Sequence, residues 1–260
     1  MDLSEFSKKE KFGTNLSKLN TMIPKIIHYC WFGHNELPPL AKKCIASWRA
    51  FLPDYEIKEW NEDNFDVNSI PYIAQAYKHQ KYAFVSDYAR FKILHEYGGI
   101  YFDTDVEVIK PIDDILEKGP FFGLEQDVKD HFACAPGLGF ACSPGLGLLR
   151  EMLELYKNLD FQQSDGSLNQ KTVVEHFSEM LLAKGLPLTP GIMEFEGVYI
   201  YPPDFFCPKP SEFGKIQITE NTRTIHHYAA SWIGPKQRFA NFLIRIFGKK
   251  LILRLWKATR

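Results

Sequence analysis

Gly98-Gly99-Ile100-Tyr101-Phe102-Asp103-Thr104-Asp105 is the most informative run of residues in this chain. The two glycines end a segment with helical apolar spacing, residues 86–97, and the three apolar residues after them are typical of a short buried strand. Residues i and i+2 of a strand point to the same face, so the two aspartates are expected to lie side by side. The run therefore predicts a helix, a glycine turn and a buried strand that ends in two carboxylates.

Two carboxylates on one side of a strand end can share one cation. Their hard oxygen ligands suit Mg²⁺ or Mn²⁺, which keep coordination positions free for water and for phosphate oxygens. Most Asp-x-Asp sequences are solvated turns or caps, so this pair gains its meaning from the motifs around it. Asp103 and Asp105 are the candidate metal ligands.

The composition is that of an ordinary globular domain. The chain has 260 residues, of which 45% are hydrophobic and 24% charged, so it can bury a sizeable core. Its formal net charge of −1 argues against a general nucleic-acid binder. Five cysteines, an odd number without metal-ligand spacing, indicate a reducing compartment. Since the sequence shows no membrane-spanning apolar run and no signal-peptide core, we expect a cytoplasmic protein.

The first half of the chain alternates between strand-like and helical patterns. Residues 1–21 are expected to form a flexible leader and residues 22–235 the folded domain. The predicted elements at its start are strand 23–33, helix 39–51, strand 55–60, and helices 70–79 and 85–97. Strands alternating with helices predict an α/β domain with a mixed, mainly parallel central sheet.

The second half of the domain is less regular. Its predicted elements are glycine-rich strands 121–124 and 137–142, helices 146–159 and 172–184, and late strands 216–218 and 224–227. Glycines inside strands indicate places where a ligand or another backbone approaches closely.

The C-terminal segment, residues 236–260, is a basic tail. It contains eight basic residues and no acidic one, interleaved with bulky apolar side chains. On a helical wheel Arg238, Asn241, Arg245 and Lys249 share one narrow face. Such a helix either contacts an anionic membrane surface, here the inner face of the plasma membrane, or packs on the domain with its lysines in water.

Asp87 and Arg90 lie three residues apart on the predicted helix that leads into the Asp-x-Asp strand. Asp87 can accept hydrogen bonds from sugar hydroxyls, and Arg90 can donate two hydrogen bonds to hydroxyl or phosphate oxygens. The alternative is a surface salt bridge, worth at most about 1 kcal/mol.

A second polar group lies far downstream, at His226-His227 and Ser231-Trp232. Histidine is a natural further ligand for a divalent site with two carboxylates, and the Ser231 hydroxyl and Trp232 indole N–H can donate to phosphate oxygens. Adjacent strand residues point to opposite faces, so one of the two histidines is expected at a metal. The alternative is a pair of structural histidines.

Four motifs in this order resemble glycosyltransferase family 32, which includes capsular-polysaccharide and yeast-type mannosyl transferases. The motifs are Ile23-Pro24-Lys25-Ile26-Ile27-His28 with Trp31, Ser86-Asp87-x-x-Arg90, Gly98-Gly99-Ile100-Tyr101-x-Asp103-x-Asp105, and His226-His227 with Ser231-Trp232. Because they span residues 22–235, the set is more specific than any single motif. The sugar-transferring domains of large clostridial toxins are similar around the same residues.

The resemblance implies a GT-A fold, a single nucleotide-binding α/β domain whose Asp-x-Asp holds Mn²⁺, or Mg²⁺, on the donor diphosphate. It also implies that Trp31 stacks on the donor base and that Tyr101 lines the nucleoside pocket. Asp87 and Arg90 are implied to grip the donor sugar.

The remaining roles follow from the same resemblance. Asp103 is implied to touch ribose or sugar and to share the metal, and Asp105 to be the direct ligand. His226, with His227 as the alternate, takes the C-terminal ligand position. Ser231 and Trp232 are the expected donors of hydrogen bonds to the leaving phosphate. Related enzymes retain the anomeric configuration, so retention is expected.

The sequence therefore predicts a metal-dependent retaining glycosyltransferase. Its donor is a nucleotide sugar, with a UDP-sugar favoured, and its acceptor a polysaccharide or lipid-linked glycan in cell-surface polysaccharide synthesis. The candidate catalytic residues are Asp87, Arg90, Asp103 and Asp105. The alternatives are a metal-dependent phosphohydrolase or nucleotidyltransferase, and a sugar-nucleotide-binding module without catalysis. Polar residues after the strand at 121–124, which are Glu125, Gln126, Asp127 and Asp130, either reach the acceptor side or form a solvated loop.

Overall fold

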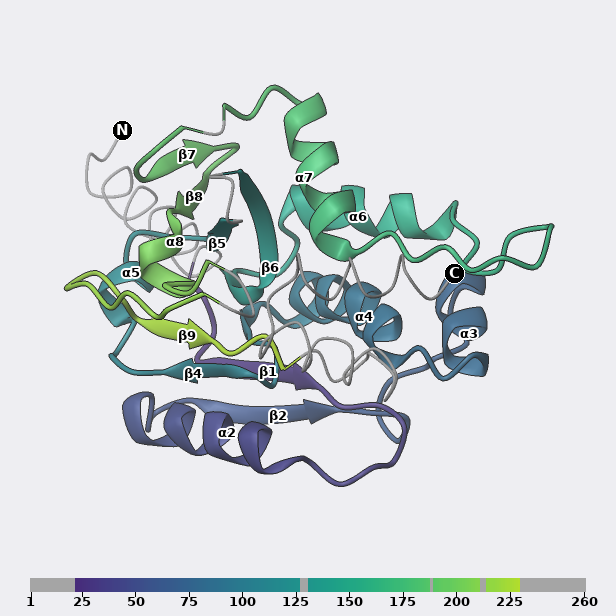
Figure 1. Ribbon diagram of the computed structural model, residues 1–260, viewed down its shortest axis with the longest axis horizontal. Coiled ribbons are helices and arrows are strands. Elements are labelled where there is room, and N and C mark those ends of the chain that lie inside the picture. Colours follow the sequence, from purple (N-terminus) through teal and green to yellow (C-terminus); the bar gives the residue numbers. More distant parts are fainter. Residues whose placement is uncertain (1–21, 127–130, 188, 211–213, 230–260) are drawn as a thin grey trace, which may run out of the picture.

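A computed structural model describes residues 22–126, 131–187, 189–210 and 214–229 of the chain. The predicted leader and the basic tail lie outside these ranges, as do Ser231 and Trp232. A seven-stranded sheet in the order β2-β1-β3-β6-β5-β8-β7 forms the centre, with helices on both faces (Figure 1). A smaller sheet pairs β4 with β9.

The described part of the chain contains these elements. The strands are β1 (Ile26–Cys30), β2 (Glu56–Trp60), β3 (Gly99–Tyr101), β4 (Val106–Val108), β5 (Phe121–Gln126), β6 (Phe132–Cys142), β7 (Met193–Phe195), β8 (Val198–Tyr201) and β9 (Thr224–His226). The helices are α2 (Pro39–Phe51), α3 (Pro71–Lys78), α4 (Tyr82–Tyr97), α5 (Asp113–Leu116), α6 (Gly147–Lys157), α7 (Val173–Ala183) and α8 (Pro203–Phe206).

The central sheet is mixed. Strand β1 runs parallel to β2 and β3, and β5 runs parallel to β8. Strand β6 is antiparallel to both of its neighbours, and β7 is antiparallel to β8. The predicted α/β class, and the mixed sheet that the expected GT-A fold requires, are confirmed.

Two apolar cores lie on the two faces of this sheet. Consecutive strand residues alternate between them: Tyr101 belongs to the core under α3, α4, α6 and α7, whereas Ile100 and Phe102 belong to the core under α2, α5 and α8. Helix α4 is buried on most of its circumference, because it contacts β1 and β3 on one side and α3 and α6 on others. Two polar residues of α4, Asp87 and Arg90, are therefore held inside the molecule.

The predicted glycine turn joins α4 to β3. Gly98 caps the helix with a φ of 63° and Gly99 follows with a φ of 91°, a backbone region that side chains disfavour. A Cβ on Gly99 would lie 2.6 Å from the backbone oxygen of Ile26 on the neighbouring strand. The two glycines thus let the chain reverse directly from the helix into the middle of the sheet.

The small β4–β9 sheet brings the end of the described chain to the Asp-x-Asp region. Val106, directly after Asp105, pairs with His226. Trp48 of α2 donates its indole N–H to the Val106 oxygen at 2.8 Å and so fixes this sheet on the domain.

Several sequence predictions of single elements need correction. Residues 216–218, predicted as a strand, have no regular secondary structure, and Ile216 and Ile218 are exposed. The short strands β4, β7 and β8 were not predicted. All five cysteines are buried and free. In the part of the chain that is described, no helix is both long and apolar enough to cross a membrane.

His28, inside the first predicted motif, is fully buried and held in one tautomer. The Trp60 indole N–H donates to Nδ1 at 3.1 Å, so the proton is on Nε2, which donates to the Gly98 oxygen at 2.9 Å. Burial lowers the pKa of His28 to about 4, because the charged imidazolium would lose its hydration. Neutral His28 therefore links β1, β2 and the glycine turn.

Acidification should destabilise the fold through His28. An unfolded histidine titrates near its usual pKa of 6.5, so between pH 6.5 and 4 the unfolded chain binds the proton and the folded one does not. The contribution of neutral His28 to the free energy of unfolding is fully present above pH 6.5. Up to about 3 kcal/mol of it is lost as the pH falls to 4. Denaturant unfolding across this range measures it.

The matched variant is His28→Gln, which keeps a donor and an acceptor but cannot be protonated. Burial raises the pKa of Asp87 to about 6, which acts in the opposite direction in wild type and variant alike, so the difference between the two proteins isolates His28. If the free energy of unfolding changes with pH in the same way for both proteins, a buried neutral His28 is contradicted.

Candidate active site

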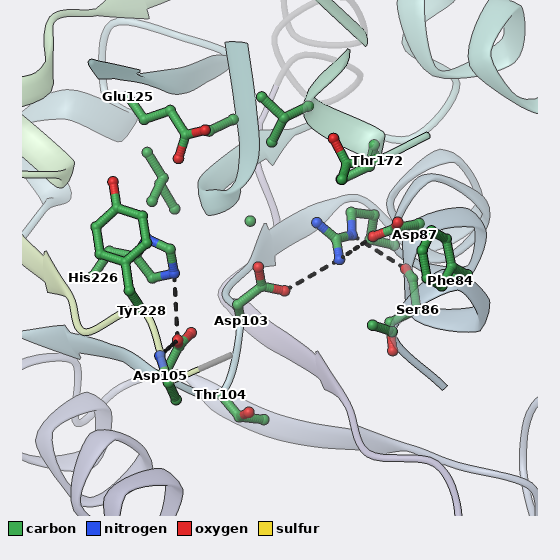
Figure 2. A pocket seen from close by; sticks show the side chains of 18 of the residues that line it. Phe84, Ser86, Asp87, Asp103, Thr104, Asp105, Glu125, Thr172, His226 and Tyr228 are labelled. Carbon is green, nitrogen blue, oxygen red and sulfur yellow. Dashed lines mark hydrogen bonds and ion pairs between the residues drawn. The ribbon is translucent and has the colours of Figure 1, made fainter. Parts of the chain in front are cut away.

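A pocket of about 610 Å³ opens at the carboxyl ends of the central strands. Trp31 follows β1, Asp103 and Asp105 follow β3, and Glu125 lies near the end of β5; all of them line the pocket. Open α/β sheets bind ligands at this end of their strands. The start of α7, at Thr172, closes another side (Figure 2).

Arg90 is the centre of one cluster in this pocket. Its Nη2 lies 2.9 Å from Oδ1 of Asp87 and 3.3 Å from Oδ1 of Asp103. Its Nε donates to the Ser86 oxygen at 3.2 Å, and its guanidinium lies 5.0 Å from the centre of the Tyr101 ring. The Tyr101 hydroxyl donates to Asp103 at 3.2 Å. Arg90 therefore holds two carboxylates that belong to different elements.

The alternative of a surface salt bridge between Asp87 and Arg90 is wrong, because the two residues are only 7% and 5% exposed. Burial raises the pKa of Asp87 to about 6, against the opposing effect of Arg90. Burial alone would lower the pKa of Arg90, yet the surrounding Asp103, Tyr101 and Asp87 raise it, so the cation persists. The cluster is a fixed charge arrangement with one edge open to the pocket.

The Asp-x-Asp sequence is a turn rather than a strand end. Strand β3 stops at Tyr101, and the Val106 N–H donates to the Asp103 oxygen at 3.0 Å across the turn. In this structure Asp103 pairs with Arg90, whereas Asp105 pairs with His226 (Figure 2). A turn changes the direction of side chains at i and i+2, which a regular strand keeps parallel.

Asp105 and His226 form the second cluster. Oδ2 of Asp105 lies 3.4 Å from Nε2 of His226 and accepts the Ala229 N–H at 2.7 Å. Burial works against the charge of Asp105, but His226 and the backbone N–H lower its pKa to about 2. Burial likewise works against a charged His226, and the neighbouring Asp105 nevertheless raises the pKa of its imidazole well above the usual value.

This second cluster fits one divalent cation. Two neighbouring ligands of an octahedral ion with bonds of 2.0–2.1 Å lie about 3 Å apart, close to the 3.4 Å between Asp105 and His226. One carboxylate and one imidazole suit Mn²⁺ and leave positions for water and phosphate. Within the described ranges no three His, Cys, Asp or Glu side chains gather as a complete cage.

The structure distinguishes between the two histidines. His226 lines the pocket, whereas the His227 ring lies 2.8 Å from Glu107, which also binds Lys43. The side chain of His227 is thus occupied in a surface ion pair on the other face of β9.

The two predicted aromatic residues lie in different places. Trp31 lines the pocket, and its indole N–H donates to the Asn35 oxygen at 2.6 Å, which fixes the ring. Tyr101 is 1% exposed and is not part of the pocket lining. It lies behind the wall and supports Arg90 and Asp103, so its predicted place in the nucleoside pocket is wrong.

The glycine-rich run in β6 was predicted as a place where a ligand or another part of the chain approaches the backbone closely. The structure shows such a contact between Gly137 and Asp103. The pairing of β5 with β6 slips between Phe122 and Gly123, so residues 136–139 leave the ladder. The Gly137 oxygen accepts the Asp103 N–H at 2.8 Å, and a Cβ on Gly137 would lie 1.8 Å from Asp103 Oδ2. Sequence reasoning missed the partner of this glycine, and it missed Tyr228, whose ring stands 4.1 Å from the His226 ring.

Comparison with known protein families identifies the family of the chain. The family model described as "Capsular polysaccharide synthesis protein" matches residues 3–137, which include the Arg90 cluster, both aspartates and Gly137. The chain belongs to this family. The match begins inside the segment predicted as a leader and ends before His226.

Individual relatives of the chain carry glycosyltransferase names. The chain is 33% identical over 107 residues to inositol phosphoceramide mannosyltransferase 3 of Schizosaccharomyces pombe, and 35% identical over 107 residues to the uncharacterized glycosyltransferase L373 of Acanthamoeba polyphaga mimivirus. These matches cover 38% and 39% of this chain, and 29% and 43% of the relatives. A solved structure named PaToxG glycosyltransferase is similar over 71% of this chain and 81% of its own, with 20% identity and a TM-score of 0.46.

Replacing Gly137 by alanine should disturb the Arg90 cluster. The added methyl group cannot coexist with the Asp103 carboxylate, so Asp103 must turn away from Arg90. We expect Gly137→Ala to lose about 1–3 kcal/mol of unfolding free energy in denaturant titrations. The control is Gly147→Ala at the start of α6, where a Cβ would meet no atom within 4 Å. Equal stability of the two variants would contradict the close contact between Gly137 and the Asp103 carboxylate.

Proposed function

We propose that this protein is a metal-dependent retaining glycosyltransferase that uses a nucleotide-sugar donor. The observation that carries the proposal is that one pocket holds two clusters of charged residues. The cluster around Arg90 is suited to sugar hydroxyls, and the pair of Asp105 and His226 is suited to a divalent cation. The glycosyltransferase names of the relatives support it.

The Arg90 cluster is suited to hold the donor sugar. Asp87 and Asp103 present acceptor oxygens for sugar hydroxyls, and the guanidinium fixes both of them in advance. Because the cluster is held by buried contacts, little freedom remains to be lost when the sugar binds. Arg90 itself stays charged and stabilises negative charge at this end of the pocket.

Asp105 and His226 are suited to hold Mn²⁺, or Mg²⁺, at the other end. The ion would neutralise the charge that grows on the departing diphosphate. The Ala229 N–H keeps the Asp105 carboxylate aimed at the pocket. Asp103 belongs to the Arg90 cluster in this structure and can contact the ion or the ribose only by turning.

Trp31 provides the place for the base of the nucleotide. Trp31 lines the pocket together with the apolar residues Pro38, Leu40 and Ala41, and a uracil can stack on its ring. A UDP-sugar is the expected donor, and we propose a polysaccharide or lipid-linked glycan as the acceptor. Cell-surface polysaccharide synthesis is the process in which such a transfer takes place.

Asp105→Asn tests the metal pair. A panel of UDP- and GDP-sugars is offered to the protein with Mn²⁺ or with a chelator, and both binding and release of nucleoside diphosphate are measured. Wild type should bind and cleave at least one donor with Mn²⁺ only, and Asp105→Asn should weaken the Mn²⁺-dependent binding by about tenfold or more, since it removes one charged ligand.

Glu107→Gln is the matched control, because Glu107 lies on β4, two residues further on, and pairs with Lys43 and His227 outside the pocket. It should bind the donor as wild type does.

Three outcomes distinguish the functions. Sugar transfer to an acceptor supports the transferase, donor cleavage with water as the sole acceptor supports a phosphohydrolase, and binding without cleavage supports a binding module.

The basic tail, residues 236–260, is proposed to contact an anionic membrane where a lipid-linked acceptor is found. Replacing Arg238, Arg245 and Lys249 by glutamine should weaken cosedimentation with phosphatidylglycerol vesicles by about tenfold or more, since each charge contributes about 1 kcal/mol. The control replaces three exposed lysines of the domain, Lys78, Lys118 and Lys157. If both variants sediment like wild type, the tail is not a membrane contact.

A further inference from the structure

Glu125 is a pocket carboxylate that the proposed function has not used. It lies near the end of β5, opposite Ala133 of β6, and its side chain enters the pocket from the side that faces Asp103 (Figure 2). His226 and Tyr228 stand beside it. Glu125 thus faces the two clusters from a strand that belongs to neither.

The other carboxylates of the pocket have partners. Arg90 binds Asp87 and Asp103, the Ala229 N–H and His226 hold Asp105, and Glu175 accepts the N–H and the hydroxyl of Thr172 in the capping box of α7. Among the described residues, no hydrogen bond or ion pair reaches the carboxylate of Glu125.

Such a carboxylate destabilises the fold unless a ligand uses it. Burial raises the pKa of Glu125, nearby His226 lowers it and Asp103 raises it, with an upward shift as the result. An unpaired charge that is largely withdrawn from water weakens the folded state. A structural role would require a partner, and the structure offers none in its described part. The position is therefore explained by something that binds in the pocket.

We propose that Glu125 is a further catalytic residue, whose carboxylate faces the anomeric carbon of the donor sugar and stabilises the positive charge that develops there. The inference rests on the proposed transferase function. With the sugar at the Arg90 cluster and the diphosphate at Asp105 and His226, the anomeric carbon lies between the two clusters. Glu125 faces this gap from across the pocket.

Glu125 forms no covalent bond and exchanges no proton during the sugar transfer. The bond between the anomeric carbon and the diphosphate oxygen breaks, and both of its electrons stay on the diphosphate. The hydroxyl oxygen of the acceptor, or of water where no acceptor is present, forms the new bond to the anomeric carbon, and its proton passes to the diphosphate oxygen. The transition state resembles an oxocarbenium ion, and a fixed carboxylate in a pocket with little water stabilises it.

Glu125→Gln tests this role, because it removes the charge and keeps the shape. With the donor that wild type cleaves, we expect kcat to fall by about 100-fold for transfer and for donor hydrolysis alike, and the donor KM to change less than about threefold. Glu175→Gln is the matched control: glutamine can still cap α7, so kcat should stay within about twofold of wild type. The Tm of Glu125→Gln should equal or exceed that of wild type.

Each other outcome is decisive. A Glu125→Gln variant that loses transfer but keeps donor hydrolysis would make Glu125 the base for the acceptor hydroxyl and would overturn the proposal. A variant with unchanged kcat, or with a reduced Tm and an unchanged kcat, would show a structural residue. If wild type releases no nucleoside diphosphate from any sugar nucleotide, the proposed function fails first, independently of Glu125.

Discussion

The buried guanidinium of Arg90 is the interaction on which the site depends. It joins the inner helix α4, which carries Asp87, to the turn after β3, which carries Asp103. Without it Asp87 would be an unpaired charge in the interior, a change that typically destabilises a protein by about 3–5 kcal/mol. The same contact fixes where Asp103 points and therefore which carboxylate is left for a cation. Stability and site geometry are determined by one side chain.

The residues that surround Arg90 come from distant parts of the sequence. Gly98 and Gly99 allow α4 to pass directly into the central strand, so Arg90 and Asp103 meet at the pocket wall, with Tyr101 behind them. The slip in β6 brings Gly137 against Asp103, where a larger residue has no room. The β4–β9 pair carries His226 to Asp105. The pocket is therefore the place where three independent packing constraints meet.

Much of this arrangement could be predicted from the sequence. The bounds of α2 were predicted as observed, and α4, the glycine turn and β3 followed from apolar periodicity and glycine placement, because those signals are local. The choice of Asp87, Arg90, Asp103, Asp105, Trp31 and His226 as pocket residues also agrees with the structure.

What could not be predicted depends on contacts between distant segments. An i,i+3 pair has the same spacing on a surface helix as on a buried one, so the burial of Asp87 and Arg90 followed only from the packing around α4. The three-residue strand β4 is too short to show a period, and its pairing with β9 decides that His226, rather than His227, faces Asp105. The divergence of the two aspartates arises from a turn that the strand pattern concealed.

The central claim is that one pocket divides the donor between two clusters, with the cation at Asp105 and His226 and the sugar at Asp87 and Arg90. Anomalous diffraction at the manganese edge, from crystals grown with Mn²⁺ and an uncleaved donor analogue, tests it most directly. The account predicts one peak within bonding distance of Asp105 Oδ2 and His226 Nε2, with the sugar density against Asp87 and Arg90. A peak bound by Asp103 without His226, or a sugar at the opposite end of the pocket, would contradict it.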